Sequence, residues 1–307
     1  MLGKVNVPIQ EVNGSLLHTK CVNLSIKRED KIHEKISGNK WRKLKYNLQF
    51  AKNNGFKQVI TLGGAYSNHI VATAAAAQKH DLHSIGIIRG DQASPLNPSL
   101  TYANECGMKL IIIDRAQFKI IRETPSSYLK NNFPQAYFIP EGGTNALGIK
   151  GCLEIIEDLD INNFDYICCP IGTGGTISGI ISGLKGNKKV LGFPALKGEF
   201  INTMIKGLLS KNLIPHTNFD IIPHYHFGGY AKFNTELIEF INAFLNENNI
   251  PLDPIYTGKM MYGIYDMIAK DYFPPKSKIL AIHTGGLQGI AGFNQRFGSL
   301  IQQHRIT

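Results

Sequence analysis

The sequence predicts an α/β protein built from two open, mostly parallel and twisted sheets, each flanked by helices. Apolar, strand-like runs alternate with helix-like segments along most of the 307 residues, a pattern typical of parallel sheets covered on both faces. The strand-like runs fall into two series, over about 56–139 and 164–285. With 43% hydrophobic and 18% charged residues, the chain can bury a sizeable core under each sheet.

The expected elements follow one another in a regular order. The first series contains the strands KQVITLGG, LHSIGIIRG, MKLIIID and AYFIPEGG, with the helices HIVATAAAAQKH and LTYANECG. The second contains the strands FDYICCPIG, KKVLGFPA and SKILAIHTGG, with the helix TISGIISGLKG after the first strand. We expect the N-terminal segment to join the second sheet. This predicts a small domain over residues 46–144 and a large domain over residues 1–45 and 145–307, with a ligand in the cleft between them.

The charge of the chain raises the possibility of a nucleic-acid partner. The formal net charge is +10 and the pI is near 9.3, and clustered lysines and arginines bind phosphate backbones. The basic residues are dense only over 27–58, however, and no nucleic-acid-binding module is recognisable. We therefore expect no nucleic-acid partner, and a basic binding protein without catalysis is the distant alternative.

The sequence gives no support for a membrane protein or for a metalloprotein. No run approaches the roughly 18 apolar residues that cross a bilayer, and the N-terminus lacks a signal-peptide core, so a cytoplasmic protein is the expectation. The five cysteines show no redox or zinc spacing and are expected to be reduced, with Cys168 and Cys169 in a buried strand. No metal site is expected.

A glycine-rich turn follows the strand FDYICCPIG and opens a helix. Its residues are Gly172, Thr173, Gly174, Gly175 and Thr176. Backbone N–H groups at such a turn, with the positive end of the helix dipole, suit a phosphate. The turn is neither a P-loop nor a G-x-G-x-x-G dinucleotide motif, so a cofactor phosphate is favoured over a dinucleotide. A tight turn without a ligand is the alternative.

Two further strands end in the same manner. The pair Ser67-Asn68 falls after two residues that follow Gly-Gly, where the N-cap of the alanine-rich helix is expected, and capping alone would explain the pair. Open α/β sheets bind ligands at the carboxyl ends of their strands, so these side chains are also candidates for ligand contacts. Thr284, in HTGG, follows the last strand.

The stretch KISGNKWRKLKYN has three possible explanations: a polyanion patch, a solvated helix face, or a reactive lysine. We expect a helix with Asn39 as N-cap, and with Lys40 and Lys43 on one face. We expect Arg42 and Lys45 to be solvated. The residues expected on the apolar face are Leu44, Leu48 and Ala51.

Lys40 stands in an unfavourable electrostatic position. A cation in the first turn of a helix opposes the helix dipole. A neighbouring positive charge or burial lowers the pKa of a lysine, and the neutral amine attacks carbonyl groups. Lys43, one turn away, could reach a phosphate on the same molecule.

Taken together and in this order, the motifs resemble one family of pyridoxal-phosphate enzymes with the tryptophan synthase β-like fold, also known as fold type II. That family contains 1-aminocyclopropane-1-carboxylate (ACC) deaminase and D-cysteine desulfhydrase. The resemblance spans nearly the whole chain, and its motifs are VPIQEV, IKRED, GGAYSN, IPEGGTNALG, GTGGT, DPIYTGKMMYG and HTGG.

The resemblance implies a cofactor, pyridoxal 5'-phosphate, in the cleft between the domains, with Lys40 as its Schiff-base lysine. It implies that Lys43 and the 172–176 turn bind the phosphate and that Asn68 binds the ring hydroxyl. Ser67 would contact the substrate carboxylate or move a proton. Tyr230 and Tyr256 match the two active-site tyrosines of the family, and a homodimer is implied as well.

Two positions separate the reactions within that family. The deaminase has Glu after the second tyrosine and Leu in the last strand-turn, whereas the desulfhydrases have Thr at both, as Thr257 and Thr284 are here. A hydroxyl facing the ring nitrogen makes a weaker electron sink than a carboxylate, which suffices for eliminating a good leaving group. We therefore expect a lyase that converts D-cysteine, or a related β-substituted D-amino acid, to pyruvate, ammonia and sulfide. ACC deaminase, or another amino-acid deaminase, is the alternative.

The chain departs from the family pattern in two segments and at one residue. The segments DKIHEKISGNK and RGDQASPLNPSLTYANECG are shorter than expected. His69 stands where the deaminase has Gln, so it either tunes substrate contacts or is a polar residue at a helix start. These departures concern the substrate and not the cofactor.

Overall fold

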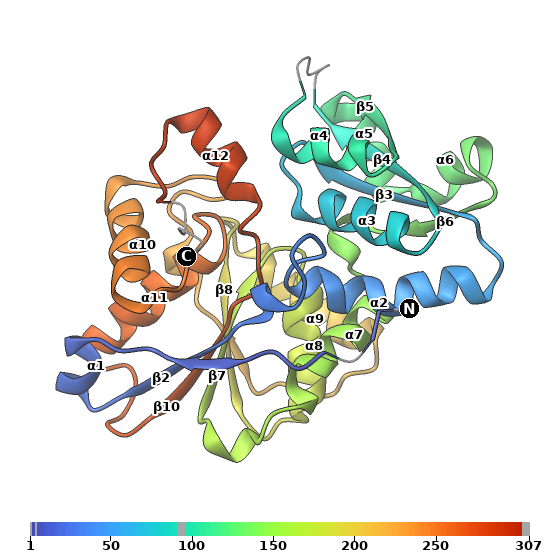
Figure 1. Ribbon diagram of the computed structural model, residues 1–307. Coiled ribbons are helices and arrows are strands. Elements are labelled where there is room, and N and C mark those ends of the chain that lie inside the picture. The colour runs from blue at the N-terminus through green and yellow to red at the C-terminus, as the bar shows by residue number, and fades with distance from the viewer. Residues whose placement is uncertain (1, 4, 91–95, 303–307) are drawn as a thin grey trace.

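The structure, a computed structural model, describes residues 2–3, 5–90 and 96–302. Within these ranges the chain forms two sheets flanked by helices, the smaller above the larger in Figure 1. The predicted α/β fold with two sheets is therefore confirmed. Residues 91–95, part of one of the two shortened segments, lie outside the described residues. No helix of the described residues is long and apolar enough to span a membrane.

The smaller sheet is parallel throughout. Its strands, in spatial order, are β5 (Met108–Ile113), β4 (His83–Arg89), β3 (Gln58–Gly64) and β6 (Ala136–Ile139). These are the four strands that the first series of apolar runs predicts. Because the interiors of the two central strands, β3 and β4, are almost wholly buried, the apolar character runs continuously along both and does not alternate.

The larger sheet joins the two ends of the chain. Its spatial order is β1 (Ile9–Glu11), β2 (Asn23–Lys27), β10 (Lys278–Ile282), β7 (Tyr166–Ile171), β8 (Lys189–Pro194) and β9 (Phe219–Ile221). Only β1 runs antiparallel to its neighbour. The strand β2 pairs with β10 from Asn23 opposite Lys278 to Lys27 opposite Ile282, so the N-terminal segment does join the second sheet, as expected.

Helices cover both sheets (Figure 1). The α-helices are α1 (Ser15–Lys20), α2 (Asn39–Asn53), α3 (Asn68–Lys79), α4 (Pro98–Glu105), α5 (Arg115–Glu123), α6 (Pro125–Asn132), α7 (Ala146–Glu157), α8 (Gly175–Leu184), α9 (Phe200–Lys211), α10 (Thr235–Asn248), α11 (Thr257–Ala269) and α12 (Gly289–Phe297). Short 3₁₀ turns are η1 (Glu29–Lys31), η2 (Glu141–Gly143), η3 (Ile161–Asn163) and η4 (Pro223–Tyr225). Cys168 and Cys169 are buried in β7, as predicted, and are free thiols.

The helix α2 connects the two halves of the molecule and carries the lysines of interest. It lies between the smaller sheet and the helices α7 and α8 in Figure 1. Its approach to α7 is close, because a Cβ on Gly151 would stand 1.9 Å from the carbonyl oxygen of Arg42. The predicted apolar face is confirmed, since Leu44, Leu48 and Ala51 are all buried.

The prediction of Asn39 as N-cap is wrong. Gly38 is the N-cap residue, in a conformation with φ of 63°, and Asn39 is the first helical residue. The Asn39 side chain instead donates a hydrogen bond of 2.8 Å to the hydroxyl of Thr176. The asparagine therefore connects the start of α2 to the start of α8.

The prediction that Arg42 and Lys45 are solvated is also wrong. Arg42 is fully buried and forms a bidentate ion pair, with N–O distances of 3.0 Å, to the equally buried Glu29. Lys45 pairs with Glu154 at 2.6 Å. Burying two opposite charges together satisfies both, so a helix face that is polar in sequence lies in the interior.

The predicted domain boundaries fall at positions with different local structure. The boundary after residue 45 lies inside the continuous helix α2. The boundary before residue 145 coincides with the N-cap of α7. The division into a small and a large domain stays a prediction.

Candidate active site

A cavity of about 850 Å³ lies between the two sheets, and most of the predicted site residues line it. The predicted residues that line it are Lys40, Lys43, Ser67, Asn68, Gly172, Thr173, Gly174, Thr176, Tyr230, Tyr256 and Thr284. Thr257 and Gly175 are not among the lining residues. The lining segments follow the carboxyl ends of β3, β7 and β10, where open α/β sheets bind their ligands.

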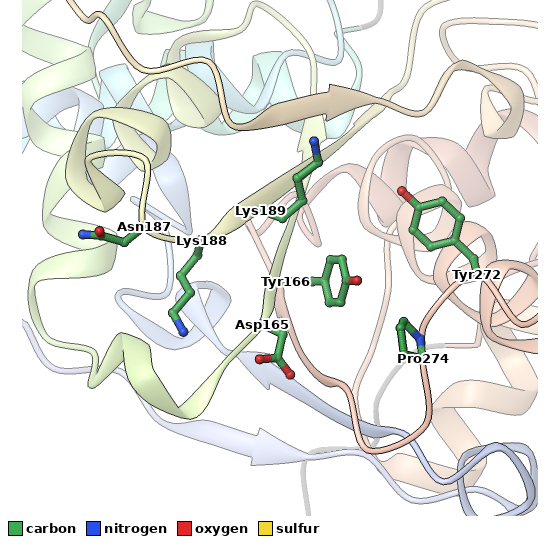
Figure 2. Close-up of a pocket in the computed structure, with 7 residues that line it drawn as sticks. All are labelled: Asp165, Tyr166, Asn187, Lys188, Lys189, Tyr272 and Pro274. Carbon is green, nitrogen blue, oxygen red and sulfur yellow. The ribbon is translucent and has the colours of Figure 1, made fainter.

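A second hollow, of about 600 Å³, lies at the opposite ends of the strands. Figure 2 shows its lining residues, among them Tyr166 and Lys189, the first residues of β7 and β8. This hollow is shallow and open, and the amine of Lys189 is already paired with Asp220 at 2.9 Å. None of the predicted site residues lines it.

Lys40 presents an amine suited to attack on a carbonyl. Burial and the nearby charge of Lys43 lower the pKa of Lys40 to about 7. Its amine forms no ion pair with another described residue, so no carboxylate of the described chain holds it in the charged form. At neutral pH, a large fraction of the Lys40 side chains therefore carries the nucleophilic neutral amine.

The start of α8 forms an anion cradle. Its N-cap, Gly174, has φ of 83° and supplies no side chain to the free N–H groups of the first turn. A Cβ on Gly175 would stand 2.9 Å from the hydroxyl oxygen of Thr144 and 3.1 Å from the amine of Lys43. The cation and the helix N-terminus thus lie side by side, as phosphate binding requires.

Lys43 is held in this place by the turn after β6. Its amine donates to the carbonyl of Gly142 at 2.9 Å and to the hydroxyl of Thr144 at 3.2 Å. That hydroxyl is 2.5 Å from the hydroxyl of Thr173. Thr144 was not predicted as a site residue, although it follows Gly-Gly after a strand, as Ser67 nearly does.

The side chains of Ser67 and Asn68 differ in their hydrogen bonding at the start of α3. The Ser67 hydroxyl oxygen accepts from the backbone N–H groups of His69 and Ile70, so the N-cap predicted at the Ser67-Asn68 pair is Ser67, and Asn68 is the first helical residue. The same hydroxyl donates to none of the residues that the structure describes, and Ser67 lines the cavity, so its proton is available to a ligand. The side-chain oxygen of Asn68 is buried and has no hydrogen-bond partner among the described residues, so it awaits a polar group from a ligand.

His69 lies on the cavity wall as a neutral imidazole. Burial and the charges of Lys40 and Lys43 hold the pKa of His69 well below its usual value. The Thr61 hydroxyl donates to the carbonyl of Ile139 at 2.8 Å, so the contact of 2.9 Å between Thr61 and Nε2 of His69 requires the histidine to donate. Nδ1 of His69 then keeps its lone pair, without a partner among the residues that the structure describes.

The two predicted tyrosines meet on the far side of the cavity. The rings of Tyr230 and Tyr256 are edge to face, with 6.1 Å between their centroids. Lys259 fixes the loop before Tyr230, because its buried amine donates hydrogen bonds of 2.8 Å to the carbonyls of His226 and Gly229. Burial raises the pKa of Tyr256 well above its usual value, so the phenol keeps its proton at neutral pH.

Thr257 and Thr284 differ in what they offer to a ligand. Thr284 lines the cavity. Thr257 is fully buried, and its hydroxyl donates to a carboxylate oxygen of Asp253 at 2.7 Å while accepting from the Asp253 backbone N–H at 2.9 Å. The Asp253 carboxylate also accepts from the N–H groups of Ile255, Tyr256 and Thr257.

These features fit pyridoxal phosphate. An aldehyde matches the reactive amine of Lys40, a phosphate matches the cradle at α8 with Lys43, and a ring hydroxyl matches the unpaired oxygen of Asn68. No three His, Cys, Asp or Glu side chains in the described part of the chain gather as a metal site would require.

Comparisons with known proteins agree with this fit. The profile of the family described as "Pyridoxal-phosphate dependent enzyme" matches residues 2–285. A mitochondrial protein of Arabidopsis thaliana, named bifunctional D-cysteine desulfhydrase/1-aminocyclopropane-1-carboxylate deaminase, is 33% identical over 91% of this chain and 76% of its own length. A Thermotoga maritima protein, named provisionally as an ACC deaminase, is 31% identical over 89% of this chain and 92% of its own length.

One solved structure is similar over almost the whole chain. It is described as an ACC deaminase homologue, with 30% identity, a TM-score of 0.83, and coverage of 98% of this chain and 95% of that chain.

Proposed function

The chain belongs to the family of pyridoxal-phosphate-dependent enzymes, in the group of ACC deaminase and D-cysteine desulfhydrase, and on that premise we propose that it is an α,β-eliminating lyase of D-cysteine or a related β-substituted D-amino acid. The observation that carries the proposal is Lys40, whose pKa of about 7 makes it a base at neutral pH, in one cavity with Ser67, Asn68 and the cradle at α8. The enzyme would convert one D-cysteine and one water to pyruvate, ammonia and sulfide.

The residues of this chain have distinct tasks in such a reaction. Lys40 would bind the cofactor covalently, Lys43 and the first turn of α8 would bind its phosphate, and Asn68 would bind its ring hydroxyl. When bound, pyridoxal phosphate withdraws electrons and stabilises the negative charge that develops on the substrate α-carbon. The free hydroxyl proton of Ser67 would then orient the substrate by donating to its carboxylate.

The elimination itself moves one proton and one leaving group. The neutral amine of Lys40 takes the proton from the α-carbon as this C–H bond breaks. The C–S bond at the β-carbon breaks, a C=C bond forms, and sulfur leaves with its electron pair. The resulting 2-aminoacrylate takes up water and gives pyruvate and ammonia. The protonated phenol of Tyr256, which packs against Tyr230, would serve as a proton donor from the side of the cavity that faces Lys40.

Two observations bear on the choice between D-cysteine and ACC. Position 257 carries a threonine, where the deaminase has a glutamate, and this residue type supports D-cysteine. The contact of the Thr257 hydroxyl with Asp253 adds nothing to that support, because the residue does not line the cavity. The names of several relatives favour ACC deaminase, which is the second candidate. A homodimer and a cytoplasmic location stay predictions from the sequence.

A parallel assay tests the proposal. The purified holoenzyme is offered D-cysteine and ACC at equal concentration, and pyruvate and sulfide are measured, with Lys40→Ala as the inactive control. Pyruvate with sulfide from D-cysteine, and none from ACC, supports the lyase. Pyruvate from ACC alone would transfer the assignment to the deaminase, and no product from either would reject both.

A further inference from the structure

We propose that the arginines at the mouth of the cavity form a subsite for a second anionic group, so that the preferred substrate is an amino acid whose β-substituent carries a carboxylate, phosphate or sulfonate. The inference rests on the proposed function, because it adds a substrate class to the same cavity. Four arginines line the cavity: Arg89 at the end of β4, Arg115 and Arg122 on α5, and Arg296 on α12.

The distribution of arginine over the chain is the first argument. The sequence has seven arginines and twenty-six lysines. Of the arginines in the described residues, Arg28 and Arg42 are buried in ion pairs with Asp30 and Glu29, and all the others line this cavity. Of the lysines in the same described ranges, only Lys40 and Lys43 line it. A merely basic surface would place lysines at the mouth, as it does elsewhere on this protein.

The choice of arginine has a chemical meaning. A guanidinium group is planar, always charged, and matches carboxylate, phosphate and sulfonate with two parallel hydrogen bonds. A lysine amine is a strongly hydrated point charge that selects weakly among anions. Concentrating the exposed arginines at one opening therefore points to recognition of an anion and not to solubility.

Arg89 is the arginine best placed to meet a substrate. A Cβ on Gly64 would stand 3.7 Å from a guanidinium nitrogen of Arg89, and Gly64 precedes Ser67 by three residues at the end of β3. The Arg89 guanidinium also lies over the ring of Phe118, 5.5 Å from its centroid. Stacking leaves the N–H edge free, so the group reaches the cavity already oriented.

The cavity contains too little negative charge to neutralise these arginines. Glu141 is the only acidic side chain among the described lining residues. Burial raises the pKa of Glu141, against the nearby charges of Arg122 and Arg89. Arg122 has a weak contact with Glu123 at 3.5 Å, and Arg296 stacks on Phe297. An incoming anion would therefore meet a surplus of positive charge.

The test compares two ligands of nearly equal shape and different charge. D-aspartate and D-asparagine, and their L-forms, are titrated into the holoenzyme by calorimetry, because neither carries a good leaving group on the β-carbon. We expect aspartate of one enantiomer to bind about tenfold more tightly than asparagine, since charge-assisted bidentate contacts are roughly twice as strong as neutral ones. The preference should shrink in high salt.

Variants locate the effect. Arg89→Gln should remove most of the preference by weakening aspartate binding much more than asparagine binding, while Arg89→Lys should retain part of the preference. Lys119→Gln is the matched control, because Lys119 is an exposed cation on α5 that does not line the cavity. It should leave the preference intact.

The outcomes separate this inference from the proposed function. Equal binding of aspartate and asparagine, or a preference unchanged in Arg89→Gln, would overturn the subsite whether or not D-cysteine is a substrate. A preference that Arg89→Gln abolishes supports the subsite even if neither D-cysteine nor ACC yields pyruvate, in which case the proposed function alone fails.

Discussion

The backbone carbonyl of Thr284 accepts a hydrogen bond of 3.1 Å from the backbone N–H of Asn39, the residue immediately before Lys40. The turn after the last strand thereby holds the start of the helix that carries the proposed Schiff-base lysine. Gly38 makes the contact possible, because a Cβ there would stand 2.0 Å from the Thr284 oxygen, and its φ of 63° disfavours other residues.

Gly38→Ala should therefore separate the turn from the helix. We expect a loss of about 1–3 kcal/mol in the free energy of unfolding, from backbone strain and overlap, together with weaker cofactor binding. Urea unfolding and a cofactor titration measure both. Gly207→Ala on α9 is the control, since a Cβ there meets nothing within 4 Å and should leave stability unchanged or raise it by up to about 1 kcal/mol. Equal behaviour of the two variants would contradict the role of Gly38.

The pKa of Lys40, about 7, sets the pH dependence of cofactor attachment. Only the neutral amine attacks the aldehyde, so the attachment rate of pyridoxal phosphate to apoenzyme should rise tenfold per pH unit below about 7 and level off above it. Stopped-flow absorbance across pH 5.5–9 follows this. Borohydride reduction and peptide mapping should place the label on Lys40, with Lys52→Ala as an unaffected control. A rate that still climbs steeply above pH 9 would show an ordinary lysine.

Removing the Lys40 amine should stabilise the apoenzyme. The folded pKa lies below the unfolded value of 10.5, so between about pH 7 and 10.5 the unfolded chain binds more protons, and this lysine costs stability increasingly as pH falls through that window. Lys40→Met should gain about 1–2 kcal/mol at pH 7, discounted because the cavity admits water, and almost nothing near pH 10.5. Urea unfolding at the two pH values measures the difference. A variant that is less stable at pH 7 would refute this reading.

The stability of the protein should be sensitive to a charge introduced at position 257. The Thr257 hydroxyl and N–H both bind the Asp253 carboxylate, which is 2% exposed. Thr257→Val should cost about 1–2 kcal/mol for the lost hydrogen bond to a charged group. Thr257→Glu should cost about 3–5 kcal/mol, because it buries a second carboxylate beside the first. Denaturant unfolding of both variants gives the comparison. If Thr257→Glu folds as stably as the parent and gains ACC turnover, the residue would face the cofactor after all.

The sequence predicted those parts of the fold and site that depend on local chemistry. Buried parallel strands are apolar throughout, and glycines mark the strand-to-helix turns. Both sheets and the turn at 172–176 could therefore be predicted from the sequence. The N-cap at the Ser67-Asn68 pair was readable for the same reason. Helical spacing put Lys40 and Lys43 on one face, and both line the cavity, whereas their roles were predicted from the family resemblance.

Features that depend on distant partners were not readable. Arg42 lies off the apolar face of its helix, and only the fold brings Glu29 beside it. The contact of Asn39 with Thr176 likewise joins residues 137 positions apart. The arginines are scattered over four positions in the sequence and meet only at the cavity. Thr144 could have been found, since it follows Gly-Gly after a strand, as the other ligand-facing turns do.

The pairing of β2 with β10 determines when the active site can exist during protein synthesis. The strand β2 leaves the ribosome early, but its parallel partner ends at Ile282, so β2 must wait until that residue has been made before the larger sheet closes. The smaller sheet, complete by Ile139, has no such delay. The part of the cavity that follows β3 can therefore form before β10 has been made, whereas the part that follows β10 cannot, so capture of pyridoxal phosphate has to wait for this strand.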